Sequence, residues 1–258
     1  MSGPIVGSSG DFAAGFYGKL PTHGDFVSRR LPRAFIDTWD EWLQQAIARS
    51  RDQLREHWLE VYLTSPIWRF VLSAGICSEA PWAGVLMPSV DRVGRYFPLT
   101  IAARLPKGSS VVQALLKADR WFMEIEQLAL SCLDDAFELG AFDDALQALD
   151  LFSVLPAEAD LDVAAAREQH DRNAMALHFG PVQPGPVIWP QIAGCVLQAL
   201  VPDYSLWLTN GSDRIQASLL VCAGLPSVER FSALLDGRWV EWSWQDHQVA
   251  AYFNTTEK

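Results

Sequence analysis

Three short apolar segments that follow one another along the chain constrain the fold most strongly. They span residues 66–75, 82–88 and 96–105, and each is rich in aliphatic and aromatic side chains. The connections between them are short and contain turn-forming residues, which favours antiparallel neighbours because a parallel crossover needs about a dozen residues or more. The sequence therefore predicts a sheet with an antiparallel centre.

Two amphipathic helices are expected to pack against this sheet. The first follows Pro32, a residue suited to a first helical turn, and extends to about Trp58. The second begins after Gly108, with Ser109 or Ser110 as its cap, and extends to about residue 137. Apolar residues recur at helical spacing, as in the first helix at Phe35, Ile36, Trp39, Trp42, Leu43, Ala46 and Ile47. We expect the second helix to lie across one face of the sheet.

Further elements at both ends of the chain are expected to extend the same sheet. A short strand is predicted at 15–21, and Asn210-Gly211 is a strong hairpin signal between two later strands. The later elements are a helix at 191–201, strands at 204–209 and 215–224, and a helix at 226–237. The expected fold is a single α/β domain over residues 1–258, in which a mixed, largely antiparallel sheet is covered by helices on both faces.

A variable region is predicted at about 134–190. Residues 134–172 contain eleven acidic residues against two arginines, and residues 179–190 are rich in proline and glycine. The acidic part is best interpreted as a solvated helical face, with a docking patch for a basic partner as the alternative. The second part is interpreted as a loop or linker.

The overall charge excludes several classes of partner. A net charge of -11 disfavours binding to nucleic acid and to anionic lipid surfaces. The N-terminal segment does not have the pattern of a signal peptide, and the apolar run at 187–201 is too short to span a bilayer. We therefore expect a cytoplasmic protein without direct membrane insertion.

Familiar catalytic and cofactor motifs are missing from the sequence. There is no HExxH, EF-hand, GxSxG, GxxxxGK[ST] or GxGxxG pattern, so no catalytic residue, metal ligand or cofactor site is predicted. The four cysteines lie far apart and have apolar neighbours, which indicates buried free thiols in a reducing compartment.

Two polar loops remain as candidate functional segments, at 18–32 and 88–98. Both carry acids close to arginines in irregular segments with glycine and proline. The candidate residues for partner docking or loop architecture are His23, Asp25, Arg29, Arg30, Asp91, Arg92, Arg95, Tyr96 and Phe97. We expect the two loops to meet, so that Asp25 or Asp91 pairs with Arg92 or Arg95.

Three interpretations of the second loop stay open from the residues alone. Asp91, followed by Gly94, suits a rigid β-turn in which the carboxylate caps backbone amides. Exposed arginine and aromatic residues would instead suit a surface for a protein partner. The third interpretation is an enzyme or a sensor that binds a small anion between the 18–32 and 88–98 loops.

Four ordered blocks of the sequence closely resemble a known family. The blocks are GFYGKLPTHGDFVSRRLP, WDEWLQQAIARSR, SPIWRFVLSAG and WAGVLMPSVDRVGRYFPLT, which together cover roughly residues 15–105. They resemble the TagF family, also called ImpM, of type VI secretion-associated proteins. Further along the chain, SLWLTNGS and GLPSVERFSALLDG are similar to the C-terminal part of that family.

The resemblance implies a regulatory protein without enzymatic activity. Members of the family look like cytoplasmic, post-translational repressors of the secretion apparatus that act on a forkhead-associated-domain scaffold protein. They oppose the threonine-phosphorylation pathway that activates secretion. Some relatives carry a PP2C-type phosphatase domain, but this sequence has no run of metal-binding aspartates that resembles one. The expected partner is therefore a scaffold protein, and no cofactor is expected.

Overall fold

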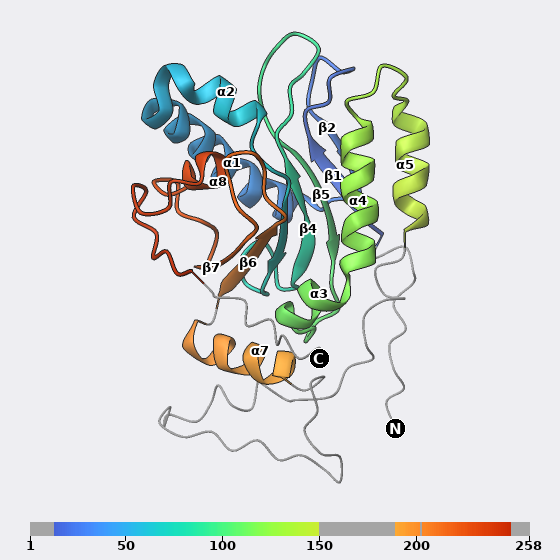
Figure 1. Ribbon diagram of the computed structural model, residues 1–258. Coiled ribbons are helices and arrows are strands. Elements are labelled where there is room, and N and C mark those ends of the chain that lie inside the picture. The colour runs from blue at the N-terminus through green and yellow to red at the C-terminus, as the bar shows by residue number, and fades with distance from the viewer. Residues whose placement is uncertain (1–12, 150–188, 202, 249–258) are drawn as a thin grey trace, which may run out of the picture.

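A seven-stranded antiparallel sheet forms the centre of the protein (Figure 1). The computed structural model describes residues 13–149, 189–201 and 203–248. Its strands are β1 (Gly15–Gly18), β2 (Val27–Arg29), β3 (Trp68–Leu72), β4 (Trp82–Met87), β5 (Leu99–Arg104), β6 (Tyr204–Thr209) and β7 (Ser218–Ala223). They are ordered β2-β1-β5-β4-β3-β6-β7, and every pairing among these strands is antiparallel. The predicted antiparallel centre is confirmed as β3, β4 and β5.

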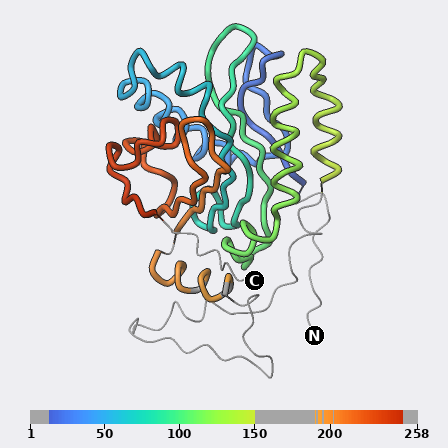
Figure 2. The backbone as a smooth tube through the Cα atoms, in the orientation of Figure 1, coloured from blue at the N-terminus to red at the C-terminus, as the bar shows by residue number. Residues whose placement is uncertain are grey.

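Helices cover both faces of the sheet, as predicted. One face is covered by α1 (Arg33–Leu54), α2 (Trp58–Leu63) and α8 (Ala233–Asp236), and we call it the α1 face. The other is covered by α3 (Val111–Lys117), α4 (Asp119–Ser131) and α5 (Leu139–Ala148), and we call it the α4 face. The helix α7 (Trp189–Leu200) lies against α3. The backbone path in Figure 2 shows the C-terminal segment returning to the side of α1 and α2.

Side chains alternate between two cores because neighbouring residues of a strand point to opposite faces. In β3, Phe70 packs into the core of the α1 face, whereas Val71 packs into that of the α4 face. Tryptophans dominate the α1 face. The Nε1 of the fully buried Trp39 donates a 2.8 Å hydrogen bond to Oγ1 of Thr100, and the Nε1 of Trp42 donates to the carbonyl of Pro226 at 2.7 Å. These bonds satisfy the polar atoms that burial removes from water.

Both long predicted helices are interrupted. The first ends at Leu54 because Arg55 has a φ of 50°, and the chain then passes through a 3-10 turn, η2 (Arg55–His57), into α2. The second is divided at Ala118, which joins α3 to α4, and α4 ends at Ser131. Periodicity did not reveal these breaks, because the apolar spacing continues on either side of each one.

The C-terminal elements are shorter than predicted. The hairpin at Asn210-Gly211 is present, but its loop occupies residues 210–217, so β7 begins at Ser218 instead of residue 215. Only residues 233–236 of the predicted 226–237 helix are helical, and turns precede them. The helix expected at 191–201 is confirmed as α7.

Parts of the variable region fall outside the described residues. Of the acidic stretch at 134–172, only residues up to 149 are described, and they include α5. Of the proline- and glycine-rich segment, residues 179–188 lie outside, and its last two residues begin α7. None of the helices in the described ranges has the length and apolar character needed to cross a membrane.

Cys77, Cys132 and Cys222 are buried free thiols, as predicted. Burial raises the pKa of each of them to about 12, because the thiolate would lose its solvation. The side chain of Cys195 is outside the described part of the structure.

Candidate functional site

Two connecting loops meet at one end of the sheet. Residues 19–26 join β1 to β2, residues 88–98 join β4 to β5, and we call them the paired loops. They lie next to each other at the top of Figure 1. The hydrogen-bonded pairing of β1 with β5 brings them together. The approach is close: a Cβ on Gly18, whose φ is 140°, would lie 2.2 Å from the carbonyl oxygen of Pro98. Only glycine fits at this position, so Gly18 of the GKLP segment permits the close approach of the two loops.

Asp91 is the centre of the paired loops. Its side chain has no exposed surface, and its carboxylate accepts four hydrogen bonds. The donors are Nζ of the buried Lys19, Nε of Arg95 at 2.7 Å, and the backbone amides of Val93 at 3.0 Å and Arg95 at 2.9 Å. The predicted β-turn is also present, since the amide of Gly94 donates to the Asp91 carbonyl at 3.0 Å. The carboxylate is therefore occupied by the protein itself.

The environment of Asp91 keeps its carboxyl group ionised. Burial alone would raise the pKa of Asp91, because desolvation disfavours the charged form. The hydrogen bonds from Lys19, from the backbone and side chain of Arg95 and from the Val93 amide outweigh burial, and the pKa lies well below its usual range. A carboxylate in this state is a poor general acid or base near neutral pH.

The predicted contact between the two polar loops is confirmed, and Arg95 makes it. Its Nη2 donates to the carbonyl of Gly24 and lies 3.6 Å from Oδ1 of Asp25. Arg92 contributes through its backbone, because its amide donates a 3.0 Å bond to the carbonyl of His23. The His23 ring contacts the hydroxyl of the adjacent Thr22 at 2.9 Å. Asp25 and Asp91 thus both pair with Arg95, while the side chain of Arg92 is exposed.

Aromatic side chains anchor the base of the paired loops. The hydroxyl of Tyr62 accepts a bond from the amide of Ser89 and donates to its carbonyl, both at 2.9 Å. Tyr96 packs edge-on against Trp58 and Tyr62. Phe97, only 5% exposed, packs against other aromatic rings. Tyr96 and Phe97 therefore support the loops from inside and present little surface to a partner.

Arg29 and Arg30 lie away from the paired loops. The strand β2 carries the chain along β1, so that Arg29 is opposite Phe16 and Arg30 follows at the far end. Arg30 has a φ of 58°, and its Nε donates to the carbonyl of Ala14 at 2.7 Å. Its Nη1 lies 2.5 Å from Oδ1 of Asp143 in α5. Arg30 therefore fastens β2 to the α4 face and takes no part in the candidate site.

Three residues of the site were not predicted from the sequence. Lys19 was inside the first polar loop, but nothing local indicated that it would be buried against Asp91. Phe26 stacks on Tyr17 with ring centroids 5.5 Å apart and remains 47% exposed. Val93 is 65% exposed at the tip of the turn. An apolar residue between charged turn residues, as in DRVGR, was the available signal for Val93.

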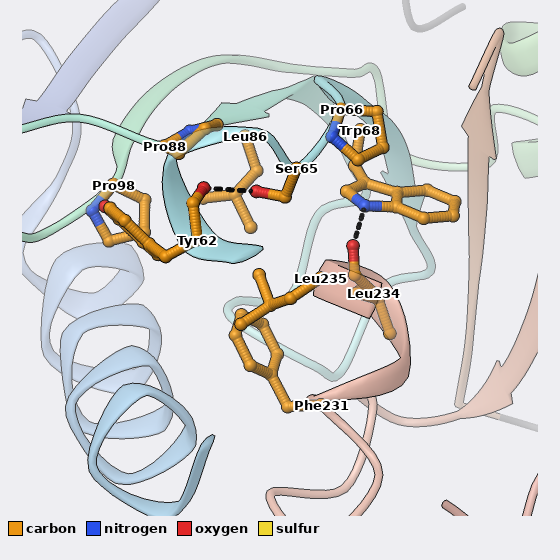
Figure 3. Close-up of a pocket in the computed structure, with 10 residues that line it drawn as sticks. All are labelled: Tyr62, Ser65, Pro66, Trp68, Leu86, Pro88, Pro98, Phe231, Leu234 and Leu235. Atoms are coloured by element: carbon orange, nitrogen blue, oxygen red, sulfur yellow. Dashed lines mark hydrogen bonds between the residues drawn. The ribbon is translucent and has the colours of Figure 1, made fainter. Parts of the chain in front are cut away.

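An apolar pocket lies directly below the paired loops (Figure 3). It is lined by Tyr62, Ser65, Pro66, Trp68, Leu86, Pro88, Pro98, Phe231, Leu234 and Leu235. Trp68 Nε1 donates to the carbonyl of Leu234 at 2.9 Å and closes one side. The volume is about 10 Å³, which is at the lower limit for a single water molecule. This pocket is a packing gap beneath the loops and is too small for a metabolite.

The chemistry of the site suits recognition better than reaction. Its buried acid is fully hydrogen-bonded, and its exposed groups are the aromatic ring of Phe26, the side chain of Val93 and the charged ends of Asp25, Arg92 and Arg95. Within the described ranges, no three His, Cys, Asp or Glu side chains are grouped so that they could hold a metal ion.

Comparison with known proteins identifies the family of the chain. The family model of the TagF N-terminal domain, described as type VI secretion system-associated, matches residues 15–149. The crystal structure of PA0076 from Pseudomonas aeruginosa PAO1 is 35% identical in sequence, with a TM-score of 0.69, and the match covers 93% of this chain and 98% of that one. No protein with a curated description matches the chain. The match to the family model and the similarity to PA0076 show that this chain belongs to the TagF family of type VI secretion system-associated proteins.

Proposed function

We propose that this protein is a non-enzymatic, post-translational negative regulator of a bacterial type VI secretion system. It acts in the cytoplasm by binding a regulatory or assembly component, such as a forkhead-associated-domain scaffold protein. Membership of the TagF family supports the link to secretion. One observation supports the binding mechanism: in the paired loops, the buried carboxylate of Asp91 is fully hydrogen-bonded within the protein. The side chains of Phe26, Val93, Arg92 and Arg95 are exposed and can contact a partner.

The rigidity of the paired loops favours binding. Four hydrogen bonds to the Asp91 carboxylate and the contacts of Tyr62 with Ser89 hold the turn in one conformation. A surface that is already ordered loses less conformational entropy when a partner binds. Arginine and aromatic side chains are also the groups that most often dominate protein interfaces.

Binding of a small anion is the second candidate function, and the exposed side chain of Arg92 is the observation in its favour. An anion cradle normally needs several convergent donors. Here the two other cations, Lys19 and Arg95, are already paired with Asp91, and Asp25 adds another negative charge 3.6 Å from Arg95. The local charges therefore favour a protein surface over an anion site.

A direct binding experiment tests the proposal. The full chain and the purified forkhead-associated scaffold of the same host are mixed in a calorimeter, with Val93→Asp as the test variant and Val240→Asp as its control. Both valines are largely exposed, at 65% and 74%, so neither change should unfold the protein. We expect the Val93 variant to bind about tenfold more weakly or worse, because an interface core does not tolerate an unpaired charge.

The same pair of variants is then expressed in the host, and the secreted proteins are measured. Derepressed secretion with Val93→Asp, but not with Val240→Asp, is the expected result. Full repression by both variants would remove the paired loops from the mechanism. Failure of the unmodified chain to bind the scaffold would refute that choice of partner, and stabilisation of the protein by millimolar phosphate or sulfate that is lost in Arg92→Ala would favour the anion sensor.

A further inference from the structure

The strand β7 leaves one margin of the sheet open, and we call this margin the β7 edge. β7 is the last strand in the sheet order and pairs with β6 alone among the described strands (Figure 1). Residues 215–224 contain no charged residue and no proline, and the register of β7 on β6 runs without a bulge. Charges, prolines and bulges commonly stop an edge strand from pairing with another chain, and β7 has none of them.

The backbone of β7 presents alternate residues to the β7 edge. The amide of Gly224 donates to the carbonyl of Asp203 in the β6 segment at 2.6 Å, so every second residue back from Gly224 is bonded to β6. The residues between them direct their N–H and C=O groups away from β6. They are Leu219, Val221 and Ala223, and these backbone groups have no hydrogen-bond partner among the described residues.

The same residues carry exposed apolar side chains. Leu219 is 58% exposed and Val221 is 48% exposed. Both side chains lie on the α4 face, because the intervening Leu220 is buried in the core of the α1 face. Their neighbours on β6 are Leu208 and Leu206, which pack in the core of the α4 face. That core ends at β6 and leaves the apolar side chains of β7 uncovered.

The opposite margin of the sheet, formed by β2, is protected. β2 is only three residues long and ends in the exposed Arg29. The next residue, Arg30, is held by its ion pair with Asp143 of α5. Short strands and charged side chains are typical protections of a sheet edge. The fold therefore protects one margin and leaves the other available for pairing.

We propose that β7 pairs with β7 of a second copy of the chain, so that two sheets join across a two-fold axis at Val221. Antiparallel pairing about this axis sets Val221 opposite Val221 of the second copy, and Leu219 opposite Ala223 of the second copy. Each backbone group on the β7 edge then meets a hydrogen-bond partner. The exposed apolar side chains of both copies lie on the same side of the joined sheet and bury one another.

The chemistry of the β7 edge selects this occupant. Unpaired backbone groups in a row bind an extended strand, so a helix or a small ligand would leave them unsatisfied. Because residues 215–224 are uncharged, the edge gives no charge preference for a foreign strand. Two copies meet there without placing like charges opposite each other. A strand that pairs with itself also has to be self-complementary, and the alternation about Val221 meets that condition.

The size of the contact sets the strength of the dimer. A standard interface buries about 800 Å² on each partner, whereas β7 offers a single short strand with Leu219 and Val221 as its large exposed side chains. We therefore expect a weak dimer with a dissociation constant on the order of 10–100 µM. Added salt should strengthen it, because each copy carries a net charge of -11 and salt screens their repulsion.

Dimerisation through β7 goes beyond the proposed function and leaves the paired loops free. In the sheet, β6 and β3 separate β7 from β4, and the paired loops connect β4 to β5 and β1 to β2. One dimer would therefore present two copies of the candidate site. Two linked sites raise the apparent affinity for a partner that itself has more than one binding site.

Analytical ultracentrifugation of the full chain, from about 1 to about 500 µM, tests the proposal. Val221→Lys is the test variant, because lysine blocks edge pairing and the two lysines would lie opposite each other. Val240→Lys is the control, with the same change of charge at a side chain that is 74% exposed and outside the sheet. Thermal unfolding checks that both variants fold. We expect at least about tenfold weaker dimerisation for Val221→Lys and none of this loss for the control.

A charge-swap experiment tests the register itself. Val221→Lys and Val221→Glu are prepared separately and then mixed in equal amounts. Each variant alone places like charges opposite each other and should remain monomeric, whereas the mixture places opposite charges there and should dimerise. Only a contact that sets position 221 opposite itself predicts this recovery. The result therefore separates the β7 pairing from a contact elsewhere on the chain and from a general loss of stability.

Amide hydrogen exchange shows what covers the β7 edge. We expect the amides of Leu219, Val221 and Ala223 to exchange more slowly as the protein concentration rises. Slow exchange at every concentration would show that the chain covers its own edge, and it would overturn the proposal. A chain that stays monomeric throughout, a dimer that Val221→Lys leaves intact, or a mixture that does not associate would also overturn it. The Val221 variants keep the paired loops, and Val93→Asp keeps β7, so failure of one proposal does not imply failure of the other.

Discussion

Lys19 forms a buried ion pair with the carboxylate of Asp91, which lies 72 residues further along the chain. The Lys19 and Asp91 side chains are 6% and 0% exposed, and the pair joins the β1–β2 connection to the β4–β5 connection. Lys19 also lies over the ring of Phe26, 4.8 Å from its centroid. The two loops are therefore stabilised as one unit, and loss of this contact should affect both.

Lys19→Met should strongly destabilise the protein. The change leaves the buried Asp91 carboxylate with Arg95 as its remaining cation, and a buried charge that loses one of its partners is costly. The control is Lys107→Met, which removes an exposed ion pair with Glu79 and should have a small effect. We expect urea denaturation to show a loss of unfolding free energy several times larger for Lys19→Met. Equal effects would mean that the buried pair contributes no more than a surface pair.

The stability of the protein should depend on the ionisation of Asp91. Because the folded-state pKa of Asp91 is depressed, this carboxylate contributes stability that is fully present above its unfolded pKa of about 3.9. That contribution is lost as the pH falls from there through the folded pKa. We expect the unfolding free energy of the wild type to drop more steeply below about pH 4 than that of Asp91→Asn. Parallel curves from urea titrations would contradict this role.

Gly18→Ala should separate the paired loops. The residue has a φ of 140°, and the new Cβ would meet the carbonyl oxygen of Pro98 at 2.2 Å. We expect a loss of about 2 kcal/mol or more, because both the backbone conformation and the contact become strained. Gly140→Ala in α5 is the matched control: apart from its chain neighbours and the backbone of its own helix, no atom lies within 4 Å of the position that the new methyl group would take. Alanine should stabilise the helix there by about 0.5–1 kcal/mol. Thermal denaturation of the two variants should give opposite shifts.

The buried thiols should be unreactive in the native protein. Burial raises the pKa of Cys77, Cys132 and Cys222 to about 12, and the thiolate is the reactive form. With Cys195→Ser, we expect no fast reaction with Ellman's reagent at pH 8, and reaction of three thiols after addition of guanidinium. Rapid modification of the native variant would show that at least one of these sites opens to solvent.

Much of the candidate site was predictable because its contacts are local. Asp91 and Arg95 are separated by four residues, and a turn that ends at Gly94 brings them together without help from the rest of the chain. The position of Lys19 was not predictable, because it depends on the pairing of β1 with β5. The same pairing buries Phe97, although an aromatic residue beside an arginine is also typical of a docking surface.

The sequence by itself determined where most of the strands and helices lie, where the two polar loops are, and that the central strands are antiparallel, because each of these properties depends on residue spacing and turn composition. The tertiary structure decided which distant elements became neighbours. β6 joins the edge of β3 more than 130 residues later in the chain, and Arg30 pairs with Asp143 instead of joining the loops beside it. Such contacts depend on how complementary surfaces bury apolar area together, and no local pattern of residues records that choice.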